Sequence, residues 1–253
     1  MSTHCSPLSD RRFTPNFRNH RPPNPNLLYS SSRIQSLFKQ ASEDSYVVTT
    51  SSTIFRAQGG EQPNDVGFVH SLTSPSESGS APGPTFEVSA VRSTTQGIIC
   101  HLGYFSSASA RVFEVNERVG QEINGVKRDL RSRLHTAGHV LGFAVRLLSA
   151  STPGIRESKA SHAPGAAFVE FRGPTDRKHK DVIQAKVDEL VQQALSVRIN
   201  WWSEEEAREW RTVVLENVKI KEGEAVSVCE VDGVGSYPCG RTHVVGTAER
   251  TTW

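Results

Sequence analysis

Residues 128–148 read RDLRSRLHTAGHVLGFAVRLL, and this stretch decides the fold of the C-terminal half of the 253-residue chain. Its apolar side chains recur every three or four positions, which is the spacing that gathers them on one face of a helix. The sequence therefore predicts an amphipathic helix over these residues. The apolar face consists of Leu130, Leu134, Ala137, Leu141, Ala144, Val145 and Leu148.

The residues that follow mix helical and strand-like patterns. A second apolar face of helical period predicts a helix over residues 177–195, and Ser203 with Glu206 forms a capping box that predicts the start of a third helix. Helices interleaved with strands predict an α+β domain over residues 125–253. The expected strands are residues 168–171, 197–202, 226–231 and 242–245.

The stretch before this domain shows short apolar runs separated by Gly, Pro and Ser. Runs at this spacing predict a small all-β domain, a barrel or a sandwich, over residues 45–124. Residues 71–84 within it are expected to form a loop rich in Ser, Pro and Gly. The expected strands are residues 46–48, 53–55, 86–88, 97–102 and 111–115.

Residues 1–44 are rich in Ser, Pro, Asn and Arg and lack hydrophobic periodicity, so a disordered tail is expected. Their six Lys or Arg residues against three Asp or Glu residues leave open a mitochondrial transit peptide. The tail is preferred because no amphipathic helix repeats through the segment. No run approaches the roughly 20 apolar residues that span a bilayer. We therefore expect a cytoplasmic protein with no membrane partner, and a mitochondrial location is the alternative.

Two pairs of metal-ligating residue types stand in the predicted α+β domain. His135 and His139 lie four residues apart, so a helix presents both imidazoles on one side. Cys239 and His243 form a C-x-x-x-H pair near the C-terminus. Three imidazoles and a thiolate suit tetrahedral zinc. The four cysteines show no C-x-x-C spacing, and reduced thiols are expected.

Either pair alone is more often a set of surface or packing residues than a metal site. Their joint occurrence in one predicted domain favours a site, and so does Gly138, which stands between the two histidines of the helix. Glycine inside a helix costs about 1 kcal/mol relative to alanine. A close approach of substrate or backbone to the helix would explain this residue.

The motifs RLHTAGHVLG (residues 133–142) and YPCGRTHV (residues 237–244) resemble a signature shared by several aminoacyl-tRNA editing proteins. These are the editing domains of alanyl- and threonyl-tRNA synthetases and the free-standing alanyl-tRNA editing proteins of the AlaX type. The segment FRAQGGEQPNDVG (residues 55–67) resembles the glycine-rich F-x-x-Q-G-G-G-Q-P-x-D-x-G element of the longer AlaX proteins, and so favours the alanyl branch. The resemblance covers residues 46–250, and two motifs in the same order make it more specific than either alone.

The resemblance implies a small N-terminal β-barrel followed by an α+β editing domain that binds Zn²⁺. It implies a trans-editing aminoacyl-tRNA deacylase, which hydrolyses serine, and by extension glycine, from wrongly charged alanine tRNA and so protects translation fidelity. The expected partner is tRNA, and the expected state is a monomer or weak dimer. ATP is not expected, because no segment resembles an aminoacylation core. The implied zinc ligands are His135, His139, Cys239 and His243.

Two residues depart from the family pattern. Glu61 replaces the third glycine of the glycine-rich run, and Arg241 replaces the second glycine expected after Cys239. The chain also ends at Trp253, ten residues after the last implied ligand, where the family continues. These departures keep a second interpretation open, a catalytically inactive, zinc-stapled module that binds tRNA or a protein.

Several polar residues near the implied ligands are candidate substrate contacts. The catalytic candidates are Thr136 and Thr242 for the serine hydroxyl, Gly138 for a close approach, and His162 for proton transfer. Simpler alternatives stand beside them, because each threonine can bond a backbone carbonyl and His162 can belong to a solvated loop. The candidate tRNA contacts, whose alternative is a solvated face, are Arg131, Arg133, Lys159, Arg241, Gly59 and Gly60.

Overall fold

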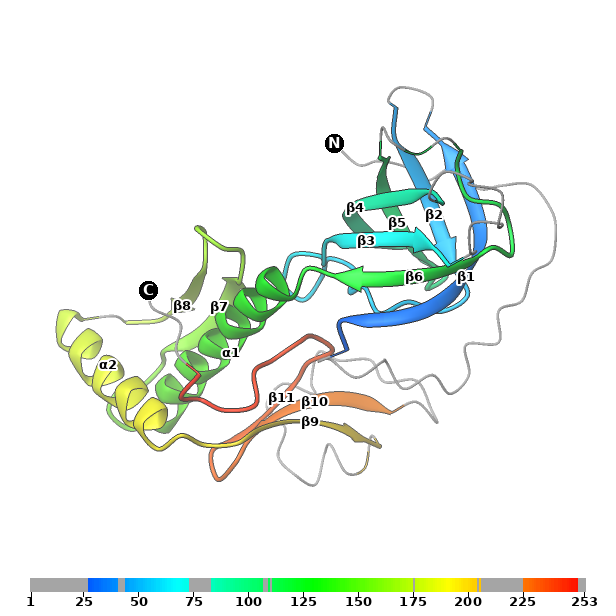
Figure 1. The fold of residues 1–253 in the computed structure, drawn as a ribbon. Coiled ribbons are helices and arrows are strands. Elements are labelled where there is room, and N and C mark those ends of the chain that lie inside the picture. The colour runs from blue at the N-terminus through cyan, green and yellow to red at the C-terminus, as the bar shows by residue number, and fades with distance from the viewer. Residues whose placement is uncertain are drawn as a thin grey trace. The chain divides into compact units, whose positions relative to one another are not determined.

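The computed structural model describes residues 27–40, 44–72, 83–106, 109, 111–174, 176–203, 205 and 225–249. The chain divides into two compact units. Figure 1 colours the chain by residue number. The barrel unit comprises Met1–Ala57 and Asn64–Asn124, and the α+β unit comprises Gln58–Pro63 and Gly125–Trp253. A short turn from the N-terminal half therefore belongs to the C-terminal unit.

Six antiparallel strands close the barrel unit in the order β1-β2-β5-β4-β3-β6. Closure depends on β1, because its C-terminal half pairs with β2 and its N-terminal half pairs with β6. A register shift between Ile34 and Ser36 lies where the two halves meet, as β-bulges do in curved sheets. The strands are β1 (Tyr29–Lys39), β2 (Tyr46–Thr50), β3 (Gly67–Ser71), β4 (Thr85–Ser93), β5 (Ile99–Phe105) and β6 (Arg118–Ile123).

Apolar side chains fill the barrel and alternate along the strands with outward residues, as the two-residue period of a strand requires. Three phenylalanine rings meet inside: Phe86 lies 5.1 Å from Phe105 and 6.4 Å from Phe113, measured between ring centroids. The predicted small β-barrel is therefore confirmed. Its fully buried residues include Ile34, Val48, Val69, Phe86, Val88, Val91 and Val119.

The predicted disordered tail over residues 1–44 is wrong for Tyr29–Lys39, which forms β1. Ile34 is the one fully buried apolar residue of this Ser-rich strand. The strand therefore has the composition of a loop, although it pairs with β2 and with β6. The barrel accordingly begins before residue 45. Residues 1–26 lie outside the described residues, and they hold most of the suggested transit segment. Most of the predicted loop at residues 71–84 lies outside them as well.

Residues 53–55 and 111–115, both predicted as strands, have no regular structure, although Phe113 is part of the buried core. Gln121 explains the first case. It is buried in β6, and its Oε1 accepts a hydrogen bond of 3.0 Å from the backbone N–H of Ile54. A side chain thus takes the place of a neighbouring strand. The sequence patterns also miss β3 and β6, because few of their residues are apolar.

Two helices and two small sheets form the described part of the α+β unit, and helix α1 (Gly125–Leu147) packs against α2 (Arg177–Gln192). Both predicted helices are confirmed, as are the strands predicted at residues 168–171, 197–202 and 226–231. Asp176 caps α2 by accepting a hydrogen bond from the backbone of Lys178. The two-stranded sheet holds β7 (Arg156–Ser161) and β8 (Phe168–Arg172), and the three-stranded sheet holds β9 (Val197–Trp202), β10 (Val226–Val231) and β11 (Gly235–Pro238).

The core of this unit lies between α1, α2 and the three-stranded sheet. The strand predicted at residues 242–245 is wrong, although the carbonyl of Val245 accepts a hydrogen bond of 2.9 Å from Val197. The short third helix predicted to start at Ser203 would run into residues 204 and 206–224, which lie outside the described residues. None of the described helices is long and apolar enough to cross a bilayer. The buried core residues are Val140, Phe143, Ala144, Leu190, Val197, Cys229 and Val231.

Glu117 carries a carboxylate at the edge of the barrel core, where its side chain is 5% exposed. Both guanidinium ends of Arg111 donate to it at 2.8 Å, the backbone of Glu114 donates at 2.8 Å, and Ser71 donates as well. Burial opposes its charge, but these hydrogen bonds together lower its pKa to about 2. The folded pKa is therefore below the unfolded value of about 4.3.

We expect Glu117→Gln to lower the free energy of unfolding of the barrel unit by about 2 kcal/mol at pH 7. A depressed carboxyl pKa stabilises the fold above the unfolded pKa, so the difference between variant and wild type should shrink as the pH falls from about 4.3 to 2. Urea denaturation at several pH values measures it. Glu114→Gln, at an exposed neighbouring site, is the matched control, and a pH-independent difference would contradict the assignment.

Candidate metal centre

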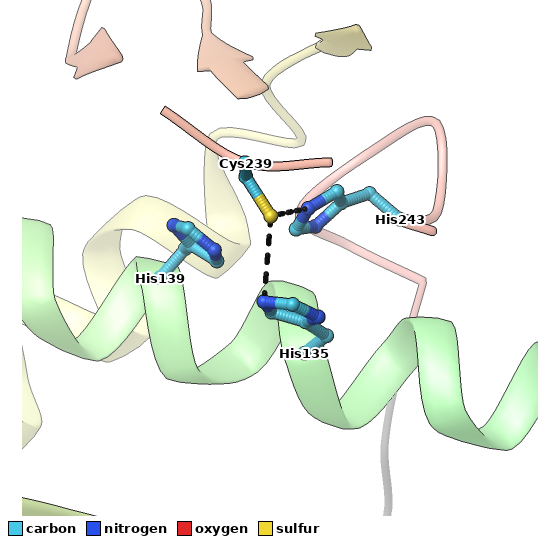
Figure 2. A group of neighbouring side chains, drawn as sticks. All are labelled: His135, His139, Cys239 and His243. Carbon is cyan, nitrogen blue, oxygen red and sulfur yellow. Dashed lines mark hydrogen bonds between the residues drawn. The ribbon is translucent and has the colours of Figure 1, made fainter. Parts of the chain in front are cut away.

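Four side chains from two separate segments converge in the α+β unit (Figure 2). One ligand atom of each lies within 4.8 Å of all the others, and the residues are His135, His139, Cys239 and His243. The Sγ atom of Cys239 lies 3.6 Å from Nε2 of His135 and 3.2 Å from Nε2 of His243. The convergence expected from the two sequence pairs is thus present.

Local structure explains how each pair is presented. On α1, the four-residue spacing stacks the rings of His135 and His139 with centroids 4.9 Å apart. Cys239 directly follows β11, and its backbone N–H donates a hydrogen bond of 2.8 Å to the carbonyl of Ser227 at the start of β10. The chain then turns, so that His243 returns to the same point, as Figure 2 shows.

Gln62 fixes the ring of His135. Its Nε2 donates to the hydroxyl of Thr242 at 2.7 Å, so its Oε1 faces Nδ1 of His135, at 2.8 Å, as an acceptor. The hydrogen of the neutral imidazole is therefore on Nδ1, and the lone pair is on Nε2, which faces Cys239. This arrangement is the one by which outer hydrogen bonds orient a metal-binding histidine.

Thr136 fixes the ring of His243 by the same logic. Its hydroxyl donates to the carbonyl of Ser132 at 2.9 Å and so has no hydrogen left to donate to Nδ1 of His243, 3.2 Å away. Nδ1 must carry the hydrogen and donate to Thr136. Nε2 of His243 therefore presents its lone pair to the same point as Nε2 of His135.

Burial keeps the three imidazoles neutral, which is the form that binds a metal. Burial, followed by the neighbouring histidines, lowers the pKa of His135 and His139 well below 6.5 and that of His243 to about 3. Burial also raises the pKa of the Cys239 thiol to about 11, so a metal must displace its proton. Nδ1 of His139 is buried with no hydrogen-bond partner among the described residues. Three neutral imidazoles and a thiol form a ligand set that fits zinc. The unpartnered Nδ1 of His139 is consistent with this, because it leaves a buried polar atom to be satisfied.

The catalytic candidates occupy different places around these ligands. The hydroxyl of Thr136 bonds a backbone carbonyl, as its simpler interpretation has it, and that of Thr242 bonds Gln62. His162 lies against the site, with its ring stacked 4.3 Å from that of His135. Gly138 explains this closeness, because a Cβ at that position would lie 2.3 Å from Cε1 of His162. The close approach that explains Gly138 in this helix is therefore made by the His162 side chain.

The candidate tRNA contacts remain predictions, and the structure shows what each now touches. The guanidinium of Arg241 lies against the backbone of Gly59 and Gly60. Arg133 pairs with Asp129 at 2.7 Å, and Lys159 pairs with Glu170 at 3.0 Å. Arg131 is half-buried on α1.

Sequence reasoning misses the contribution of the Gln58–Pro63 turn to the site. Gly59 and Gln62 bond each other's backbone in a tight turn, and the carbonyl of Glu61 accepts a hydrogen bond of 2.9 Å from the backbone of His162. The glycine-rich resemblance points to this segment but not to Gln62 as the orienting residue. Glu157 and Tyr237 are also missed, although both line the pocket beside the ligands.

We expect Gln62→Ala to weaken zinc binding by about 10- to 100-fold, because His135 loses the acceptor that holds its ring. Gln62→Glu keeps an acceptor at that place and should retain most of the affinity. Competition with a chromophoric chelator measures both, with the exposed Gln96→Ala as control. Equal affinities for wild type and Gln62→Ala would show that Gln62 does not orient the ligand.

Glu61 has a backbone φ of 64°, the left-handed region in which a side chain is strained and glycine is not. Glu61→Gly and Glu61→Ala both remove the carboxylate, so their difference isolates the backbone. We expect the glycine variant to be more stable than the alanine variant by about 1 kcal/mol. Thermal and urea denaturation of the two proteins measure this, and an alanine variant of equal or greater stability would contradict it.

Comparison with known proteins finds alanine–tRNA ligases. The chain is 29% identical over 214 residues to alanine–tRNA ligase of Thermotoga petrophila, a match that covers 83% of this chain and 23% of that protein. It is 33% identical over 141 residues to the ligase of Rubrobacter xylanophilus, covering 54% of this chain and 15% of that protein. It is 25% identical over 197 residues to the chloroplastic/mitochondrial ligase of Oryza sativa subsp. japonica, a match that covers 78% of this chain and 19% of that protein.

No family model matches the sequence. The chain spans less than a quarter of the length of these relatives, so the match concerns one segment of a larger enzyme. That segment is consistent with the resemblance to the alanyl-tRNA editing proteins. Over 83% of its length, at about 29% identity, this chain is a distant homologue of alanyl-tRNA synthetases.

Proposed function

We propose that this chain is a zinc-dependent hydrolase that removes serine, and also glycine, from misacylated alanine tRNA. The observation that carries the proposal is the convergence of three imidazoles and a thiol within 4.8 Å, in a homologue of alanyl-tRNA synthetases. His135, His139, Cys239 and His243 would hold the ion. Bound zinc would supply a Lewis acid that polarises an ester carbonyl and acidifies water.

A four-residue ligand set usually marks a closed structural zinc site. The surroundings here favour a catalytic role, because a pocket of about 320 Å³ opens beside the ligands within the α+β unit. The pocket wall includes His162, Glu157 and Tyr237 alongside three of the four ligands. An ester brought into this pocket would therefore meet the ligands and polar side chains together.

His162 is the residue of this wall suited to handle a proton. Burial lowers its pKa to about 4, so its imidazole is neutral at pH 7 and can accept a hydrogen bond from a water molecule. The backbone contact with Glu61 and the stacking on His135 hold the ring in place. We therefore assign to His162 the positioning of the attacking water.

Selection of serine over alanine needs a polar group that bonds the serine hydroxyl, since an apolar pocket separates such a pair poorly. The hydroxyls of Thr136 and Thr242 are both engaged within the protein. Tyr237 and Glu157, whose oxygens lie 3.1 Å apart in the pocket wall, offer polar atoms at the surface of the cavity. We propose this pair as the contact for the serine hydroxyl.

We expect the zinc-loaded chain to deacylate serine-charged alanine tRNA, and both His139→Ala and Cys239→Ala to reduce the rate by 10²-fold or more, roughly, because each removes a ligand. His70→Ala, in the barrel unit, is the matched control. Release of radiolabelled serine measures the rate, with alanine-charged alanine tRNA and serine-charged threonine tRNA as competing substrates. Zinc-loaded protein that releases no serine would favour the inactive binding module instead.

A further inference from the structure

The pocket beside the ligands carries an unequal set of charges. Apart from histidines and the cysteine, its charged wall residues are Glu61, Glu157 and Arg241. Two carboxylates thus stand with one guanidinium around a cavity of about 320 Å³. Which charge a ligand meets depends on where each of these side chains is held.

Arg241 is directed at the glycine turn. A Cβ built on Gly59 would lie 2.2 Å from one of its terminal nitrogens, and a Cβ on Gly60 would lie 2.9 Å from its Nε. The guanidinium therefore occupies the space above these two glycines. Its positive charge is placed over the backbone of the turn, while both carboxylates also line the cavity.

Glu61 is held at the pocket by its own backbone and by its side chain. Its left-handed φ of 64° and its carbonyl contact with His162 fix where the side chain leaves the turn. Oε1 then accepts a hydrogen bond of 3.2 Å from the backbone N–H of Ala160, and the side chain is 46% exposed. The other oxygen, Oε2, lies 3.7 Å from the nearest nitrogen of His162, which is too long for a hydrogen bond.

The charge of Glu61 acts on Glu157, which lines the same pocket. The pKa of Glu157 is raised, first by burial and then by the negative charge of Glu61. Repulsion of this kind is relieved by a small cation bound between or beside the two groups. A strained backbone that keeps a carboxylate at such a place is typical of functional sites.

We propose that Glu61 binds the α-ammonium group of an aminoacyl ester, so that the pocket selects aminoacyl groups with a free amine over N-acylated ones. This inference rests on the proposed function. A protonated amine offers three N–H donors and one positive charge, and a carboxylate oxygen is the acceptor that bonds it most strongly. In an aminoacyl ester the amine is one carbon from the carbonyl. An ester beside the metal ligands therefore brings its amine to the same small cavity.

The experiment compares two ligands that resist hydrolysis, the serine amide of 3′-amino-3′-deoxyadenosine and its N-acetyl derivative. Calorimetry with the zinc-loaded full chain gives both dissociation constants at one ionic strength. The wild type should prefer the free amine by about 10-fold or more, the usual effect of a hydrogen bond between charged groups. Glu61→Gln keeps the shape and the acceptor for Ala160 but removes the charge, so its preference should fall to within about twofold. Glu189→Gln, an exposed carboxylate of α2, should retain the wild-type preference.

The outcomes separate this inference from the proposed function. A wild type that prefers the free amine, with a preference lost in Glu61→Gln, supports the inference even if serine-charged tRNA is not hydrolysed. Hydrolysis of that tRNA by a protein that binds both amides equally supports the function and overturns the inference. A preference that survives in Glu61→Gln, or no binding of either amide to the wild type, overturns it as well.

Discussion

The candidate metal centre depends on hydrogen bonds that fix which nitrogen is free on two of its three imidazoles. Gln62 accepts from Nδ1 of His135, and Thr136 accepts from Nδ1 of His243, so both Nε2 atoms carry lone pairs toward Cys239. Without these acceptors, the buried rings could adopt the other tautomer, and their Nε2 lone pairs would no longer face Cys239. The two acceptors come from distant parts of the sequence, so the fold must bring a turn and a helix together before the four ligands share one point.

The Gln58–Pro63 turn is what links the barrel sequence to this constraint. The chain leaves the barrel unit after Ala57 and returns at Asn64, and the six residues between them belong to the α+β unit. A hydrogen bond from the backbone of Asp65 to the carbonyl of Arg56 closes the base of the turn. Irregular segments of the barrel unit, up to Ala57 and from Asn64, therefore flank the turn that holds Gln62.

Sequence patterns predict the parts of this protein that depend on local periodicity. The helix that carries His135 and His139 follows from its apolar spacing, and the four residues of the candidate metal centre follow from two motifs. The pattern fails at β1, whose serines pair with the two neighbouring strands β2 and β6. It also fails at residues 53–55, where the backbone of Ile54 donates a hydrogen bond to the side chain of Gln121. In both cases a distant partner decides the structure. The role of Gln62 is hidden for the same reason, because its two partners lie 73 and 180 residues away.

Glu61 and Arg241, the two departures from the family pattern, have a common structural setting. Arg241 covers Gly59 and Gly60, so a side chain at either position would have to displace the arginine side chain. Glu61 follows in a left-handed conformation that costs about 1–2 kcal/mol for a residue with a Cβ. A glycine there would avoid this cost, so the strain is retained against stability. The two departures thus place one negative and one positive side chain on the wall of the pocket beside the candidate metal centre.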